Sequence, residues 1–132
     1  MSDGSWDDVL SEYKNGQRES GKEDLNWMEK LVARLLAERD LSKLYPVTSH
    51  DRLIVFIGES FERVYNKPVL MIELSGENRE NLKDRYRFKF SLTTGREDGE
   101  LFRESAEIVF CAFENALGVF DEMFAKLEEI SR

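Results

Sequence analysis

Hydrophobic and polar residues alternate most regularly over residues 84–92. The apolar positions of this segment are Tyr86, Phe88, Phe90 and Leu92. The polar positions between them are Arg85, Arg87, Lys89 and Ser91. A period of two residues is typical of a β-strand with one face in the protein core and the other in water. We therefore predict a strand here, with three cations on its solvated face.

Two shorter apolar segments, residues 52–57 and 69–74, predict two more strands. Both are rich in β-branched residues, and turn-forming residues such as Gly58 and Pro68 adjoin them. Because both sides of the first segment are apolar, we expect that strand to lie inside a sheet. One side of that sheet would carry Leu53, Val55, Ile57, Leu70, Ile72 and Leu74. The opposite side would carry Ile54, Phe56, Val69 and Met71.

Apolar residues at helical spacing predict two helices before these strands. A first helix covers residues 5–16, and residues 17–21 form a polar linker. A second helix opens with a capping box at Ser20 and ends near Asp40. We expect the apolar residues that follow it to continue its packing until Pro46 stops it.

The longest apolar pattern predicts a third helix over residues 101–130. Its broad apolar side carries five of the nine phenylalanines, which are Phe102, Phe110, Phe113, Phe120 and Phe124. A narrower apolar stripe beside it carries Leu101, Ile108, Ala112 and Val119. A polar strip with acids at Glu107, Glu114 and Asp121 remains for water. We expect the core to be organised around this helix.

The order of these elements predicts an α+β fold. An antiparallel meander of three or four strands would pack against the long C-terminal helix, with two N-terminal helices and the helices chiefly on one face. The length of 132 residues suits a single domain over residues 1–132. Residues 1–19 are a candidate for a loosely attached N-terminal helix and linker.

The net charge of the chain excludes some classes of binding partner. A net charge of -8 and a sequence pI near 4.8 argue against binding to nucleic acid or to an anionic membrane, because polyanions repel each other at long range. No apolar run is long enough to span a bilayer, and the first residues carry no basic or apolar leader pattern. We therefore expect a cytoplasmic protein. The single cysteine, Cys111, excludes a disulfide within the chain.

Candidate catalytic groups are sparse. The one histidine, His50, precedes Asp51, and such a pair is able to serve as an oriented general base, although a plain surface loop explains it as well. A zinc site from His50 and Cys111 would lack two ligands. Residues 94–99 contain two glycines but lack the lysine and hydroxyl of a phosphate-binding loop. We predict no cofactor and no metal, and the sequence favours a non-catalytic protein while leaving an enzyme open.

One constellation on the sheet suggests binding. Ile54, Phe56, Val69 and Met71 would form an apolar patch away from the long helix, bordered by Arg85, Arg87 and Lys89. An apolar patch with a polar rim is typical of an interaction surface, unless the first helix covers it. The cations also suggest binding of an anion or nucleic acid, but the aromatic residues that would stack on bases alternate onto the opposite face.

The first functional hypothesis is therefore a non-catalytic protein-binding module of the inhibitor, immunity-like or escort type. It would act through an apolar sheet or helix surface of an acidic domain. The alternatives are a small-molecule or enzymatic pocket between sheet and helix, and anion or nucleic-acid binding through the basic strand face. We also predict a symmetric homodimer through either of two surfaces, because the long helix carries more apolar surface than one sheet face covers. The two surfaces are the narrower helix stripe and the apolar patch of Ile54, Phe56, Val69 and Met71.

Overall fold

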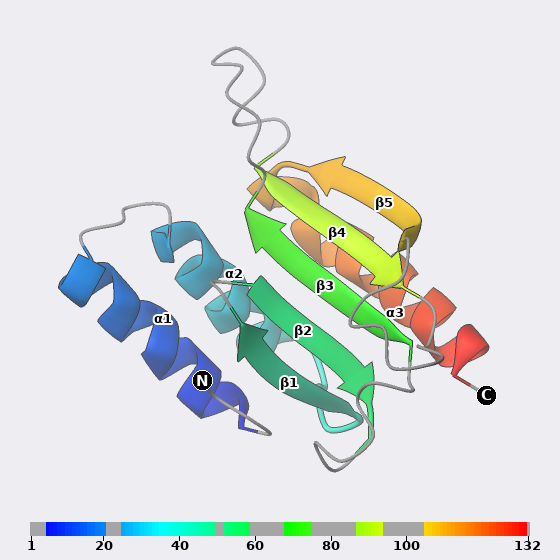
Figure 1. Cartoon of the computed structure of the whole chain (residues 1–132), viewed down its shortest axis with the longest axis horizontal. Helices are drawn as coiled ribbons and strands as arrows, with labels where there is room; N and C mark the ends of the chain where they lie inside the picture. Colours follow the sequence, from blue (N-terminus) through cyan, green and yellow to red (C-terminus); the bar gives the residue numbers. More distant parts are fainter. Residues whose placement is uncertain are drawn as a thin grey trace.

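The computed structural model describes residues 5–20, 25–49, 52–58, 68–74, 87–93 and 105–131. Within these ranges the chain forms two helices, five strands and a further helix (Figure 1). The helices are α1 (Trp6–Ser20), α2 (Leu25–Glu38) and α3 (Ala116–Ile130), and a 3-10 turn, η2 (Phe113–Asn115), precedes α3. The strands are β1 (Leu44–Ser49), β2 (Arg52–Ile57), β3 (Val69–Leu74), β4 (Phe88–Thr93) and β5 (Ser105–Cys111).

The strands form one antiparallel sheet in the order β1-β2-β3-β4-β5, so each strand pairs with its neighbour in sequence. This arrangement confirms the predicted α+β meander with two N-terminal helices and a long C-terminal helix. The sheet has five strands where three or four were predicted. The strands predicted over residues 52–57 and 69–74 are found with those bounds.

The helices pack on one face of the sheet (Figure 1), which we call the helix face. Its strand residues include Leu53, Val55, Leu70, Ile72, Phe88, Phe90 and Leu92. Helix residues complete this core, among them Val9 of α1, Leu31 of α2 and Phe120 of α3. The phenylalanines at the centre of this core, Phe88, Phe90 and Phe120, are at most 1% exposed, and their burial stabilises the fold through the hydrophobic effect.

The opposite face of the sheet, the outer face, carries a second and smaller apolar cluster. Its members are Val47, Ile54, Phe56, Val69 and Met71, and Tyr45 packs against them. The rings of Tyr45 and Phe56 lie 5.1 Å apart between centroids. The predicted division of the strand residues between two faces therefore agrees with the two clusters.

The predicted start of the C-terminal helix is wrong, because residues 105–111 form β5 and α3 begins at Ala116. Ala112 has extended backbone angles (φ -79°, ψ 164°) and separates the strand from the η2 turn. The run Ile108-Val109-Phe110 is β-branched and aromatic, which favours an extended chain. The same residues also fit a helical period, so spacing alone did not decide between the two.

The N-terminal boundaries also differ from the prediction. α1 continues through Gly16 to Ser20, and α2 begins at Leu25. α1 and α2 pack along each other, and such packing outweighs the helix-ending preference of one glycine. Leu44 and Tyr45, which were expected to continue the packing of the second helix, begin strand β1 instead. Pro46 is compatible with β1 because this strand lies at the edge of the sheet.

Candidate functional site

The predicted apolar patch is assembled on the outer face, but it is buried. Ile54 pairs directly with Met71 across β2 and β3, and Phe56 and Val69 belong to the same cluster. Their exposed fractions lie between 0% for Phe56 and 7% for Ile54 and Met71. A partner would reach these side chains only after a change in structure. Their role in binding stays a prediction.

The cations predicted to border the patch are not gathered on one rim. Arg85 lies outside the described residues. The guanidinium carbon of Arg87 lies 3.8 Å from the ring centroid of Trp27 in α2, in a cation–π contact with the helix layer. Lys89 lies on the outer face, where its Nζ is 3.7 Å from a carboxylate oxygen of Glu73. Glu73 also forms an ion pair with Arg52, whose Nε lies 3.7 Å from the other carboxylate oxygen, so these three charges form a row across the sheet.

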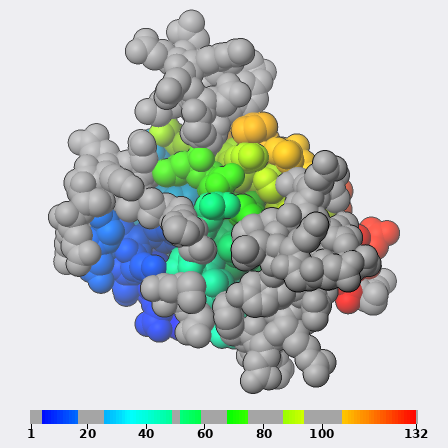
Figure 2. All heavy atoms as spheres, viewed as in Figure 1, coloured from blue at the N-terminus to red at the C-terminus, as the bar shows by residue number. Residues whose placement is uncertain are grey.

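The row of charged residues and the neighbouring row of the outer face both continue onto β5. Lys89 pairs with Phe110, and Ser91 pairs with Ile108. Ser91 is also the partner of Met71, so Ile108 continues the row that holds the buried outer-face cluster. At β5 this face reaches solvent, since the exposed fraction is 47% for Ile108 and 39% for Phe110. Figure 2, which looks onto the outer face, shows the β5 region reaching the surface at the upper right.

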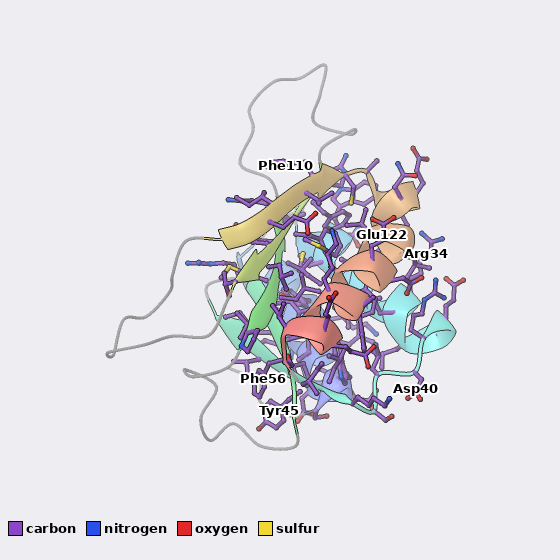
Figure 3. All side chains as sticks on the ribbon, turned by 90° about the vertical axis from the view of Figure 1, so that its right-hand side faces the viewer. Arg34, Asp40, Tyr45, Phe56, Phe110 and Glu122 are labelled. Atoms are coloured by element: carbon purple, nitrogen blue, oxygen red, sulfur yellow. The ribbon has the colours of Figure 1, made fainter. Side chains whose placement is uncertain are left out.

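The two faces of β5 are therefore unlike. Ile108 and Phe110 are exposed on the outer face, while Val109 packs against the main core and Cys111 is buried in it. Figure 3 shows Phe110 on β5 at one end of the sheet, with Tyr45 and Phe56 at the other end and Glu122 on α3. Among the described residues the only other large apolar side chain this exposed is Ile130, near the end of α3.

α3 holds β5 in place from the helix face. The Lys126 ammonium lies 2.6 Å from each carboxylate oxygen of Glu107, the one charged residue of β5. Glu122 and Glu129 lie one helical turn on either side of Lys126, and both are exposed. This edge of the molecule thus combines an apolar outer face with an acidic stripe on its helix side.

The opposite edge of the sheet is closed by α1. The Trp6 indole Nε1 donates a hydrogen bond to the Leu44 carbonyl of β1 at 3.3 Å. The Thr48 hydroxyl, which is 3% exposed, donates to the Glu12 carboxylate at 2.7 Å. Pro46 removes one backbone donor from the middle of the strand.

Groups with catalytic potential are few in the described ranges. Burial raises the pKa of the Cys111 thiol to about 11, so it is protonated and unreactive at neutral pH. His50 and Asp51 lie outside the described residues. The ranges that the structure describes contain no group of three or more His, Cys, Asp or Glu side chains able to hold a metal ion. None of their helices has the length and apolar character needed to cross a membrane.

Comparison with known proteins identifies no relative: no family model, no curated protein and no solved structure matches this chain. Sequence reasoning assigned Phe110 to the buried side of a long helix and Ile108 to its narrower stripe, so it missed that both lie on the outer face of an edge strand. The β-branched and aromatic run Ile108-Val109-Phe110 was the signal that could have placed them on a strand.

Proposed function

We propose that this chain is a non-catalytic protein-binding module that accepts an extended segment of a partner at the β5 edge. The observation that carries the proposal is the exposure of Ile108 and Phe110 on a strand that ends the described sheet. An edge strand presents outward backbone donors and acceptors, and an added strand pairs with them. The two exposed side chains would supply the apolar contacts that give such pairing its affinity.

The contrast with β1 supports this choice. Natural sheets protect their edges with proline, with charged side chains or with a covering helix. β1 has Pro46 and α1 beside it. β5 has no proline, and its single charged side chain, Glu107, points to α3. Inhibitors, immunity-like proteins and escort proteins act by such direct contact with a partner, without bond chemistry.

The symmetric homodimer stays a prediction, but its proposed interface changes. Ile108 and Val119 were placed on one helical stripe, whereas Ile108 lies on the outer face of β5 and Val119 packs against the main core. A dimer through Ile108 would have to use β5, so it is an alternative to a partner segment on the same edge. A monomer mass by light scattering over a dilution series from about 100 µM would contradict it.

Selection from a random peptide library displayed on phage tests the proposed edge. The folded chain serves as bait, and the Ile108→Asp variant serves as the counter-selection bait. We expect peptides that bind the parent and lose at least about tenfold in affinity to the variant, because an aspartate would be buried unpaired. On binding, amide hydrogen exchange should slow within residues 105–111.

Ile130→Asp is the matched control, because Ile130 has a similar exposed fraction but lies on α3. Peptides that bind the parent and both variants equally would show that the β5 edge is not the docking site. Thermal melting of both variants confirms that each remains folded before binding is compared.

A further inference from the structure

The further inference rests on the proposed function and names the chemistry of the partner. We infer that the β5 edge takes an extended segment in which apolar residues alternate with lysine or arginine. The juxtaposition that points to this partner is an apolar outer face beside an acidic stripe on the same edge. Each face of an added strand would meet one of them.

The register of a strand added to β5 determines where its apolar residues would lie. Side chains of a strand alternate between the two faces of its sheet, and a strand added to β5 alternates in step. Its outer-face residues would lie beside Ile108 and Phe110, which are 47% and 39% exposed. Apolar or aromatic residues at these positions would cover both side chains and extend the row that runs through Ser91.

The charges at this edge favour basic residues at the alternate positions of the partner segment. The helix side of this edge carries Glu107, Glu122 and Glu129, with Lys126 as the cation between them. The Lys126 ammonium is already bound to Glu107, which leaves Glu122 and Glu129 as exposed acids on the same stripe of α3. The chain as a whole carries a net charge of -8. Lysine or arginine at alternate positions would therefore meet an attractive field on approach and complementary acids when bound.

The same charges argue against a second copy as the occupant. Two-fold pairing of β5 with itself would continue the sheet and place both α3 helices on the same side. The acids Glu122 and Glu129 of one copy would then approach those of the other, between two chains that each carry -8. A basic segment meets no such repulsion.

A set of capped peptides of about nine residues tests the inference by calorimetry or fluorescence anisotropy. The first alternates valine with lysine. The second alternates valine with glutamate, the third has the composition of the first in scrambled order, and the fourth carries N-methyl groups on every second residue of the first. We expect the first to bind, with an affinity at least about tenfold above each of the other three.

Charge-reversed protein variants test the acidic stripe. Glu122→Lys with Glu129→Lys should weaken binding of the valine–lysine peptide about tenfold at low salt, and less at high salt. Asp7→Lys with Asp8→Lys changes the net charge equally at exposed positions of α1, so it controls for the overall field. We expect the control to change affinity less than about threefold.

The possible results separate the two levels of the proposal. No binding of the valine–lysine peptide at about 1 mM would overturn the inference, as would equal binding of the valine–glutamate peptide or equal losses in both charge-reversed variants. If any of these occurs while library peptides still depend on Ile108, the docking edge stands and the basic partner is wrong. If the N-methylated peptide binds as well as its parent, strand addition itself is wrong. A dimer mass abolished by Ile108→Asp, without binding of the peptide, assigns the edge to a second copy.

Discussion

The two edge strands of the sheet, β1 and β5, differ in how much of each is covered by other parts of the chain. β1 is packed against α1, with Trp6 and Glu12 bonded to it and Pro46 in its middle. Among the described residues, α3 contacts β5 from the helix face, where Lys126 is bonded to Glu107. The outer face of β5 presents exposed apolar side chains. The β1 edge therefore contributes to stability, whereas the β5 edge is available for contact with a partner.

Loss of the contact between α1 and β1 should lower the free energy of unfolding more than any other change considered. Trp6→Ala should lower the free energy of unfolding by about 2–4 kcal/mol, because a partly buried indole and its hydrogen bond to Leu44 are lost. Ile108→Thr on the open edge keeps a β-branched side chain and should cost less than about 1 kcal/mol. Urea denaturation measures both. Equal losses would show that β5 is as integral to stability as the α1 contact.

Thiol labelling tests the contrast between the two faces of β5. Cys111 should react with a maleimide or disulfide reagent at pH 8 at least about a hundredfold more slowly than in the unfolded chain, because burial raises its pKa from 9.0 to about 11. Ile108→Cys in a Cys111→Ser background should react about as fast as an unfolded cysteine. Slow labelling of both would mean that the outer face of β5 is covered in solution.

The same thiol predicts a dependence of stability on pH. The folded chain keeps the Cys111 proton up to about pH 11, whereas the unfolded chain loses it near pH 9.0. The folded state therefore binds more protons between these values. Its stability from this group is complete below pH 9 and decreases as the pH rises toward 11. The Cys111→Ser variant should lack this part of the alkaline decrease in a urea titration.

The hydrogen bond between Thr48 and Glu12 should have an intermediate effect. Glu12→Ala leaves the buried Thr48 hydroxyl without this carboxylate acceptor, and we expect a loss of about 1–2 kcal/mol. Adding Thr48→Val should reduce that loss, because no hydroxyl then remains to be satisfied. Strictly additive effects in the double-mutant cycle would show that this contact does not hold α1 to β1.

The ion pair between α3 and β5 should contribute least to the free energy of unfolding. Lys126 and Glu107 are both partly exposed, with side-chain exposures of 44% and 37%. A double-mutant cycle with Lys126→Ala and Glu107→Gln should give a coupling of less than about 1 kcal/mol, and less again in high salt. A coupling well above that value would place α3 as firmly on β5 as α1 is on β1.

The sequence predicted the fold class better than it predicted the two edges. The strands at residues 52–57 and 69–74 are internal, and their continuous apolar character is typical of strands that are buried on both faces. β1 and β5 are edge strands, and each carries an ambiguous pattern. Pro46 suggested a stop in β1, and in β5 the apolar spacing fits a helix as well as a strand.

The candidate site depended on these edges, so the sequence could supply only part of it. It grouped Ile54 with Met71 correctly by face, but it could not show that their side chains are 7% exposed. Burial depends on contacts between distant segments, which no local pattern records. Phe110 was assigned to the buried side of a helix. The structure instead pairs it with Lys89 on the outer face of the sheet, where it is exposed.

The consecutive order of the meander also has a consequence during synthesis on the ribosome. The chain emerges from the N-terminal end, so α1 and β1 are available to form the closed edge before β3, β4 and β5 exist. Each later strand is an open edge only until the next one pairs with it. β5 is the last strand of the described sheet to be synthesised, and no later strand of the described fold pairs with its outer edge.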